Sequence, residues 1–112
     1  MDSIKDARER ILEFRDERNW KQFHSPKDLA ISISLEASEL LEVFQWSGSD
    51  VGAEGKEGKI AEELADILIY CFLLADAAGL DVGGIILDKL RMNEGKYPVD
   101  KAYGSKAKYT EL

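Results

Sequence analysis

The chain has 112 residues, of which 22 are acidic and 15 are basic, so its formal net charge at pH 7 is −7. Hydrophobic residues make up 45% of the chain and charged residues 33%, values typical of a globular protein, and these values exclude wholesale disorder. The acidic balance also argues against binding to a nucleic-acid backbone, which favours a basic surface.

Two helices are predicted in the first half of the chain. The first begins at Ser3, a capping hydroxyl followed three residues later by Asp6, and its apolar positions advance by three and four residues as far as Arg18. The second follows Ser25 as the N-cap residue, with Pro26 at its first position. We expect this second helix to end between residues 44 and 47. The arginines of the first helix lie among acids, and we interpret them as a solvated face.

Two further helices are predicted after a loop at residues 48–58, which carries four of the nine glycines. The third helix runs from about residue 59 to residue 78, and Gly79 can end it in a left-handed conformation. Asp81 can cap the fourth helix, over residues 82–96, and Pro98 follows its end. The tail, residues 99–112, is expected to be irregular.

These elements predict an all-α fold: a four-helix antiparallel bundle with an irregular C-terminal tail, in a single domain over residues 1–112. Residues 67–75 are apolar on every side of the third helix. Such a helix lies inside a large core or is covered by another subunit, and a chain of this length has too small a core to surround it. We therefore expect a homo-oligomer.

Four acidic residues occupy positions where the helical pattern predicts burial. Glu36 lies within the apolar stripe of the second helix, and Glu39 follows it by one turn. On the third helix, Glu63 and Asp66 lead directly into the apolar half. Acids three residues apart share a helix face, so antiparallel packing of the two faces would bring all four carboxylates together. Such a cluster requires protonation or a multivalent cation, and oxygen ligands favour Mg²⁺ or Mn²⁺.

The alternative is that these residues are ordinary acids on solvated helix faces, where pairs at this spacing are common. The apolar neighbours of Glu36 and Asp66 argue against it, as does the occurrence of such a pair on two successive helices. The spacing alone leaves both interpretations open.

The two acidic pairs also resemble a known family signature. Residues 36–39 (EASE) and 63–66 (ELAD) are similar to the Glu-x-x-Glu and Glu-x-x-Asp motifs of the MazG-like superfamily of all-α nucleotide pyrophosphohydrolases. Within it the chain most resembles the dCTP pyrophosphatases, and the resemblance covers nearly the whole chain. The further matching stretches are residues 18–24, 39–46, 66–70, 96–98 and 108–112.

The resemblance implies hydrolysis of a nucleoside triphosphate between its α and β phosphates, giving a monophosphate and pyrophosphate. It also implies a catalytic centre that holds Mg²⁺ and consists of Glu36, Glu39, Glu63 and Asp66. We expect dCTP or a modified dCTP as substrate, in a house-cleaning role for the nucleotide pool, with Glu36 as the base. The alternatives are dUTP or another noncanonical nucleotide and, from another class, a helical interaction module without activity.

The same resemblance implies aromatic contacts with the base of the nucleotide. Trp20 and Trp46 each lie near a helix end and match base-binding positions, with Tyr70 one turn beyond Asp66. Core packing is the alternative role for both tryptophans. His24 lies in a matching stretch and can hydrogen-bond the base or a phosphate, although a lone histidine before a helix is more often structural.

Basic and polar residues complete the expected substrate site. The family places residues at positions like Lys89 and Asn93 near the nucleotide, often from a neighbouring subunit, and a solvated helix face is the alternative. Lys56 and Lys59 flank the glycine-rich loop and are positioned to close over the phosphates. Ile11 stands where some relatives carry a pocket histidine, which bears on base selectivity.

The location and partners of the protein follow from a few further features. The single cysteine, Cys71, excludes an intrachain disulfide and fits a reducing compartment. The first six residues are charged without an apolar signal-peptide core, and the apolar run at residues 67–75 has about half the length of a bilayer span. We expect a cytoplasmic protein that binds neither a nucleic-acid polymer nor a membrane. Its expected partners are a nucleoside triphosphate and copies of itself, in a homotetramer built as a dimer of dimers.

Overall fold

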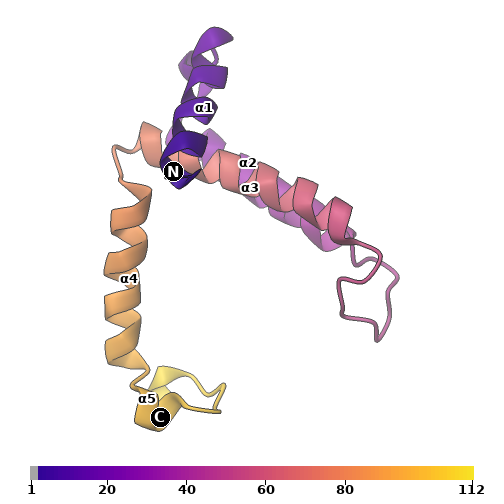
Figure 1. Ribbon diagram of the computed structural model, residues 1–112, viewed down its shortest axis with the longest axis vertical. Coiled ribbons are helices and arrows are strands. Elements are labelled where there is room, and N and C mark those ends of the chain that lie inside the picture. Colours follow the sequence, from indigo (N-terminus) through magenta and orange to yellow (C-terminus); the bar gives the residue numbers. More distant parts are fainter. Residues whose placement is uncertain (1–2) are drawn as a thin grey trace. The chain divides into compact units, whose positions relative to one another are not determined.

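The computed structural model describes residues 3–112, and helices joined by turns and loops make up this part of the chain (Figure 1). The helices are, in chain order, α1 (Ser3–Glu17), the 3₁₀ helix η1 (Lys21–Phe23), α2 (Pro26–Glu42), α3 (Glu57–Ala77), α4 (Val82–Lys96), α5 (Val99–Ala102) and the 3₁₀ helix η2 (Tyr109–Glu111). Residues 3–112 contain no strand, which confirms the predicted all-α class. The chain forms two compact units, one ending at Gly79 and the other beginning at Leu80.

The predicted helix boundaries are confirmed where a capping residue marks them. The hydroxyl of Ser25 accepts a hydrogen bond from the backbone N–H of Asp28 at 3.1 Å, at the start of α2. The carboxylate of Asp81 accepts one from the N–H of Gly84 at 2.8 Å, at the start of α4. Gly79 has a φ of +69° just after α3, a conformation that favours glycine. The position before Ser3, where α1 begins, lies outside the described residues.

Two boundaries differ from the prediction. Helix α2 ends at Glu42 rather than between residues 44 and 47, and residues 43–46 form turns in which Trp46 has a φ of 68°. Helix α3 begins at Glu57, slightly before the predicted start. Apolar side chains at helical spacing continue through residues 43–46, so periodicity alone could not detect that the backbone leaves the helix there.

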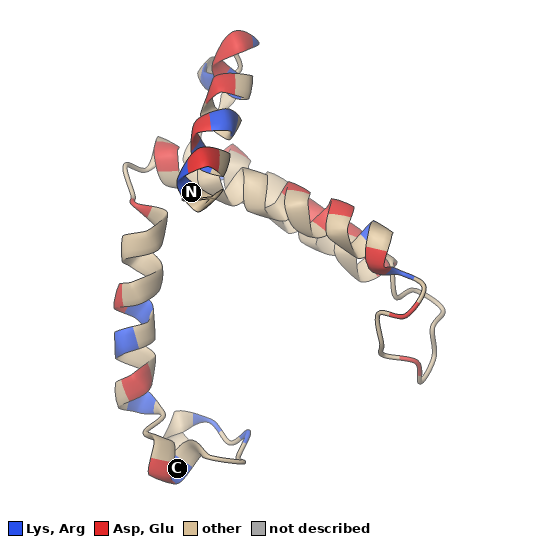
Figure 2. Cartoon of the chain, in the orientation of Figure 1, with Lys and Arg blue, Asp and Glu red and all other residues tan. Residues whose placement is uncertain are grey.

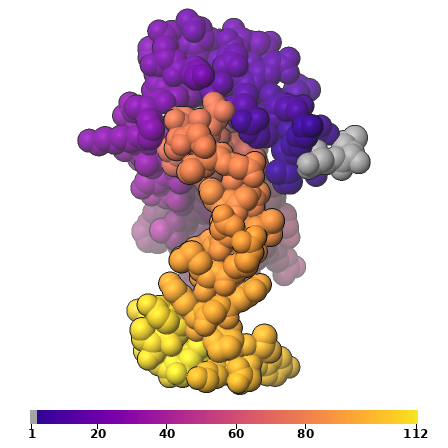
Figure 3. All heavy atoms as spheres, turned by 90° about the vertical axis from the view of Figure 1, so that its left-hand side faces the viewer, coloured from indigo at the N-terminus to yellow at the C-terminus, as the bar shows by residue number. Residues whose placement is uncertain are grey.

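The C-terminal tail is more ordered than predicted. It contains α5 and η2, and the ring of Tyr109 packs edge-on against that of Tyr97 at a centroid distance of 6.1 Å. The ammonium of Lys96 lies 4.9 Å from the centre of the Tyr109 ring. Figure 3 shows the C-terminal residues (yellow) lying against the end of this second unit. Contacts between residues far apart in the sequence order this segment, and such contacts leave no periodic signal.

The first unit is built on the hairpin of α2 and α3. These helices lie side by side and run antiparallel, because residues 43–56 join them at one end (Figure 1). Its buried apolar residues are Leu29 of α2 and Phe72, Leu73 and Ala75 of α3. Figure 2 shows that the charged residues of α3 gather toward its N-terminal half, whereas its C-terminal half is almost uncharged. Within residues 3–112 no single helix has the length and hydropathy of a membrane span.

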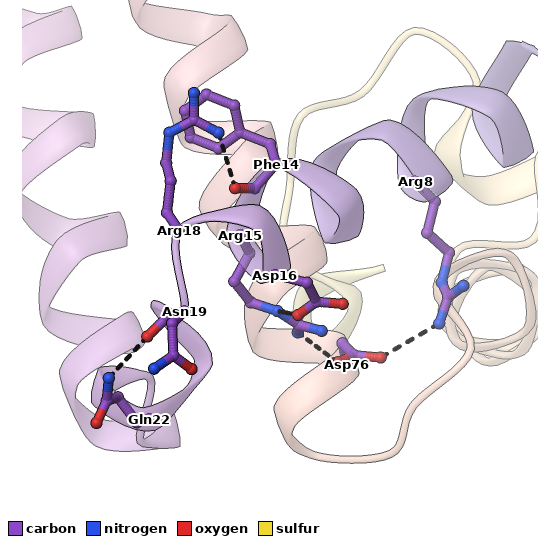
Figure 4. Close-up of polar contacts among 8 residues, drawn as sticks. All are labelled: Arg8, Phe14, Arg15, Asp16, Arg18, Asn19, Gln22 and Asp76. Carbon is purple, nitrogen blue, oxygen red and sulfur yellow. Dashed lines mark hydrogen bonds and ion pairs between the residues drawn. The ribbon is translucent and has the colours of Figure 1, made fainter.

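A network of ion pairs connects helix α1 to the C-terminal end of α3 (Figure 4). Arg15 donates from Nη1 to Asp76 Oδ2 at 2.6 Å and from Nε to Asp16 Oδ1 at 2.8 Å. Arg8 reaches the other oxygen of Asp76 at 3.3 Å. Arg15 is buried, so the predicted solvated face of arginines is wrong at this position. The two carboxylates that accept its hydrogen bonds make this burial possible.

Candidate functional site

Three of the four predicted acids converge between α2 and α3. Glu36, Glu39 and Glu63 each offer a carboxylate oxygen, and these three oxygens lie within 4.8 Å of one another. Glu36 and Glu39 share a face of α2 because one helical turn separates them. The antiparallel course of α3 brings Glu63 opposite them. Glu63 is buried, Glu36 is half-buried and Glu39 is exposed, so the cluster opens to solvent on one side.

Hydrogen bonding satisfies the carboxylates of this acid cluster (Glu36, Glu39 and Glu63) only in part. Oε2 of Glu36 and Oε2 of Glu63 are buried and have no hydrogen-bond partner. Burial, followed by the hydrogen bond and the charge of Glu39, raises the pKa of Glu63. A hydrogen bond with Glu36 raises the pKa of Glu39, and a weaker effect of Glu63 opposes this shift. Glu39 and Glu63 therefore bind protons more readily than ordinary carboxylates do, and a multivalent cation would compete with those protons.

Asp66, the fourth predicted acid, lies one turn after Glu63 on α3. It is exposed and is not one of the three converging residues. Its charge contributes to the raised pKa of Glu63, which indicates that the two carboxylates are close. Together, the orphaned oxygens and the all-carboxylate donor set fit a hard divalent cation such as Mg²⁺.

A cavity of about 630 Å³ lies next to Asp66. It lies between α1, the segment that joins α1 to α2, and the C-terminal half of α3. The residues that line it are Arg10, Ile11, Phe14, Arg15, Glu17, Arg18, Trp20, His24, Asp66, Ile69, Tyr70 and Leu73. The structure thus brings four of the predicted site residues, Trp20, His24, Asp66 and Tyr70, to one cavity.

Aromatic rings form part of the cavity wall. The ring of Trp20 packs edge-on against Phe14 at a centroid distance of 5.7 Å. The guanidinium of Arg18 lies 3.7 Å from the centre of the Phe14 ring and donates to the Phe14 carbonyl at 3.0 Å (Figure 4). Asn19 precedes Trp20 in a left-handed conformation, with a φ of 55°, and its carbonyl accepts a hydrogen bond from the side chain of Gln22. The sharp turn at Asn19 therefore sets the direction of Trp20.

His24 is half-buried beside this wall. Its Nδ1 is buried and has no hydrogen-bond partner. Burial, with a smaller effect of the Arg15 charge, lowers its pKa below the ordinary value of 6.5. The imidazole is therefore neutral at pH 7 and offers a donor and an acceptor for a bound molecule.

The remaining predicted site residues lie elsewhere. Trp46 follows the C-terminal end of α2, is 92% exposed and does not line the cavity, which lies toward the other end of the hairpin. Lys89 and Asn93 lie one turn apart on α4, in the second unit, where Lys89 is exposed and Asn93 half-buried. Lys59 pairs with Glu63 at 3.6 Å, and Lys56 pairs with Asp50 of the loop at 3.3 Å.

The sequence prediction missed the arginines and Phe14 in the cavity wall. The pattern of the first helix contained one usable signal, since Arg15 follows Ile11 by four residues and therefore shares its face. A charged residue on an apolar face is normally interpreted as the margin of that face. Only its pairing with Asp76, on another helix, identifies Arg15 as buried.

Comparisons with known proteins agree on one family. A family model described as MazG-like matches residues 31–112. The dCTP pyrophosphatase 1 proteins of Rattus norvegicus and Homo sapiens are each 37% identical to this chain. Each alignment is 115 residues long and covers 98% of this chain and 68% of the relative. The crystal structure of a pyrophosphatase from Archaeoglobus fulgidus matches with a TM-score of 0.79 and 38% identity, over 88% of this chain and 94% of that chain.

Proposed function

This chain belongs to the MazG-like family and is a nucleoside triphosphate pyrophosphatase, and we propose that it uses Mg²⁺ to hydrolyse dCTP or a modified dCTP to the monophosphate and pyrophosphate. The observation that carries the proposal is the convergence of Glu36, Glu39 and Glu63, one helical turn from Asp66, which lines a cavity with aromatic residues in its wall. The two buried oxygens without partners support a cation at this cluster.

In the proposed mechanism the four acids, Glu36, Glu39, Glu63 and Asp66, hold the metal ion. When bound, the ion supplies the positive charge that a triphosphate and its transition state require. Glu36 has a half-buried carboxylate with one unpartnered oxygen, and it accepts the proton of the water that attacks the α phosphorus. Glu63 is buried where α3 packs against α2, so its carboxylate holds the metal ion in a fixed position. Glu39 and Asp66 are exposed, so their carboxylates lie on the side from which the triphosphate enters.

The cavity beside Asp66 receives the nucleoside in this proposal. Trp20 and Tyr70 provide flat faces for the base, and such stacking tolerates any base. The neutral His24 supplies a hydrogen bond that distinguishes one base edge from another. Ile11 supplies no hydrogen bond to a base, so dUTP or another noncanonical nucleotide is the second candidate substrate.

We further propose that the site is completed in a homotetramer, a dimer of dimers. Exposed leucines and isoleucines follow one another at helical spacing on both hairpin helices: Leu64 and Leu68 on α3, and Ile31 and Leu35 on α2. A second copy would cover these side chains. Such a copy would also bring Trp46, or Lys89 and Asn93, to the nucleotide. In this assembly residues 1–112 would act as a single domain.

A helical interaction module is a weaker alternative, because such a module has no need of four acids placed as in the enzyme family.

The single cysteine supports a cytoplasmic location. Neither a nucleic-acid polymer nor a membrane is a proposed partner.

The test is a product screen across deoxynucleoside and ribonucleoside triphosphates with Mg²⁺. We expect pyrophosphate and the monophosphate as products, with the highest kcat/KM for dCTP and its 5-substituted forms. The reaction should stop in EDTA and resume when Mg²⁺ is added in excess. Release of inorganic phosphate and a diphosphate, or turnover that EDTA does not affect, would contradict the proposal.

A further inference from the structure

Arg15 is a buried cation in the wall of the cavity. Only 5% of its surface is exposed, and it lines the cavity together with Trp20 and His24. Its Nε donates to Asp16 Oδ1 at 2.8 Å, and its Nη1 donates to Asp76 Oδ2 at 2.6 Å. Neither of these bonds uses Nη2, so the N–H groups of this nitrogen are left for a further acceptor. The two carboxylates thus fix the guanidinium in position while part of its donor capacity stays free.

The other two arginines of the cavity wall, Arg10 and Arg18, are held less firmly. Both are exposed. Arg10 pairs with Glu13 at 3.8 Å, and the guanidinium of Arg18 lies over the ring of Phe14. An exposed side chain can turn toward acceptors in many positions, whereas a fixed donor bonds only to an acceptor placed opposite it. Arg15 is therefore the arginine best suited to distinguish bound molecules by the positions of their acceptors.

His24 provides an acceptor near this fixed donor. Burial and, to a smaller extent, the charge of Arg15 lower the pKa of His24, which indicates that the guanidinium is near the imidazole. The imidazole is neutral at pH 7, and its buried Nδ1 has no hydrogen-bond partner. In the tautomer that carries its proton on Nε2, Nδ1 accepts a hydrogen bond. The cavity therefore combines free N–H groups on Arg15 with a free acceptor on His24.

We propose that Arg15 selects a cytosine base, by donating from its free N–H groups to N3 and O2 while His24 Nδ1 accepts from the 4-amino group. This inference rests on the proposed function of the cavity as the base-binding site. Cytosine presents two acceptors, N3 and O2, beside one donor. Uracil and thymine instead carry a proton on N3 and a carbonyl at position 4. Their N3–H would meet a guanidinium, which has no acceptor and stays protonated.

The same arrangement also disfavours the purines. Adenine has one acceptor, N1, beside its amino group, so it lacks the second hydrogen bond that O2 of cytosine makes. Guanine carries a proton on N1 and meets the same conflict as uracil. Arg15 acts on the base and not at the phosphates, so it is a specificity-determining residue. Its removal should change the affinity for the base and leave the chemical step nearly unaffected.

Calorimetric titration of dCMP and dUMP with Mg²⁺ present tests this role, because these monophosphates differ only in the base. The unsubstituted chain should bind dCMP at least about tenfold more tightly than dUMP, since dUMP leaves a charged donor without an acceptor. In Arg15→Met the two affinities should come within about twofold of each other, mainly because dCMP binds more weakly. Arg15→Lys keeps the charge beside Asp76 but has one terminal nitrogen instead of two, so it should lose the selectivity as well.

Two matched controls separate this role from a structural one. Arg8→Met removes the other contact with Asp76 without touching the cavity, so it should keep the preference for dCMP. Arg18→Met removes an exposed arginine of the same wall and should also leave the ratio of the two affinities unchanged. A preference for dCMP that persists in Arg15→Lys would show that Arg15 has only a structural role.

Two further outcomes would decide the matter. Absence of any preference for dCMP in the unsubstituted chain, or loss of the preference in Arg18→Met but not in Arg15→Met, would overturn the inference. If this chain still released pyrophosphate from dCTP, the proposed function would stand without the inference. If it released none, the proposed function itself would be refuted.

Discussion

Arg15 of α1 and Asp76 of α3 form an ion pair of 2.6 Å, in which Arg15 is buried, with 5% of its surface exposed, and Asp76 is half-buried. Arg15 also lines the cavity, as do five other residues of α1 or of the turn just after it: Arg10, Ile11, Phe14, Glu17 and Arg18. The pair therefore fixes the position of one wall of the cavity against the helix that carries Glu63 and Asp66.

Breaking this pair should destabilise the chain measurably. We expect Arg15→Met to lower the free energy of unfolding by about 1–2 kcal/mol, because Asp76 keeps its charge but loses its buried partner. Urea denaturation measures the difference. Arg8→Met removes the exposed contact with the same carboxylate and should cost less than about 0.5 kcal/mol. Equal losses in the two variants would show that burial of the guanidinium has no particular role.

The acid cluster and Arg15 show what the sequence could and could not predict. Glu36, Glu39 and Glu63 were predictable because helical spacing fixes which residues share a face, and successive helices joined by a loop commonly pack as antiparallel neighbours. Arg15 was not, because its partner is 61 residues away in the sequence and periodicity treats a charged side chain as solvated. Pairing across helices is a property of packing, and local patterns do not record it.

The same limit explains the differences at chain turns and in the tail. The turns that follow α2 end in the left-handed backbone of Trp46, a residue type that rarely adopts this conformation. The order of the tail depends on the contact between Tyr97 and Tyr109. Capping residues with a local partner, such as Ser25 and Asp81, were by contrast predicted correctly.

Neutralising one acid of the site should abolish activity without unfolding the protein. We expect Glu39→Gln, Glu63→Gln and Asp66→Asn each to lower kcat by at least about 100-fold, because fewer charges remain to hold the metal ion. In the metal-free protein each variant should unfold at the same urea concentration or a higher one, because repulsion among the carboxylates decreases.

Glu42→Gln is the matched control for these variants. Glu42 lies on α2, one turn beyond Glu39, and is not one of the three converging residues. Its activity should stay within about twofold of the unsubstituted enzyme. Undiminished turnover in any two of the three acid variants would contradict the proposed metal site.

The single histidine should impose a pH dependence on stability. The pKa of His24 is lower in the folded chain than its ordinary value of 6.5, so the unfolded chain binds the proton more readily. His24 should therefore not reduce the free energy of unfolding above about pH 6.5. As the pH decreases from about 6.5 through the folded-state pKa of His24, the free energy of unfolding should fall. Urea denaturation as a function of pH, for the unsubstituted chain and for His24→Gln, measures this effect.

His24→Gln should flatten the pH dependence in that window, since the chain has no other histidine. The raised pKa values of Glu39 and Glu63 act with the opposite sign, because protons bound by the folded state stabilise it as the pH falls. Comparison of the two chains cancels that contribution. Identical profiles would show that burial does not perturb His24.

The exposed apolar face of the hairpin should be an interface between copies of the chain. Leu68 is 50% exposed within the apolar run of α3, and Leu64, one turn earlier, is 45% exposed. We expect sedimentation equilibrium at micromolar concentration to give a mass several times 12.6 kDa. Leu68→Lys should shift the protein toward the monomer, because a charge would be buried at the interface. A mass near 12.6 kDa for the unsubstituted chain would contradict this prediction.

The two tryptophans should both contribute to substrate binding, although they lie at different places in the structure. Trp20 lines the cavity of its own chain, and Trp46 is 92% exposed at the far end of the hairpin. We expect Trp20→Ala and Trp46→Ala each to raise KM for dCTP by about tenfold, because one stacking contact contributes about 1–3 kcal/mol. The value of kcat should be nearly unchanged, since a contact remote from the phosphates contributes equally to substrate and transition state.

Mixing two inactive or weakened variants separates the roles of the tryptophans. If Trp46 reaches the nucleotide from a second copy, mixing the Trp46→Ala and Glu39→Gln chains should form some sites with an intact acid cluster and an intact Trp46. The KM of the mixture should then fall toward the value of the unsubstituted enzyme. Trp20 and the acids belong to the same chain, so Trp20→Ala mixed with Glu39→Gln should recover nothing. Recovery in both mixtures would show that the cavity of one chain is not the base-binding site. If Trp46→Ala left the KM unchanged for each of dCTP, dUTP, dTTP and dATP, this result would show that Trp46 does not contact the base.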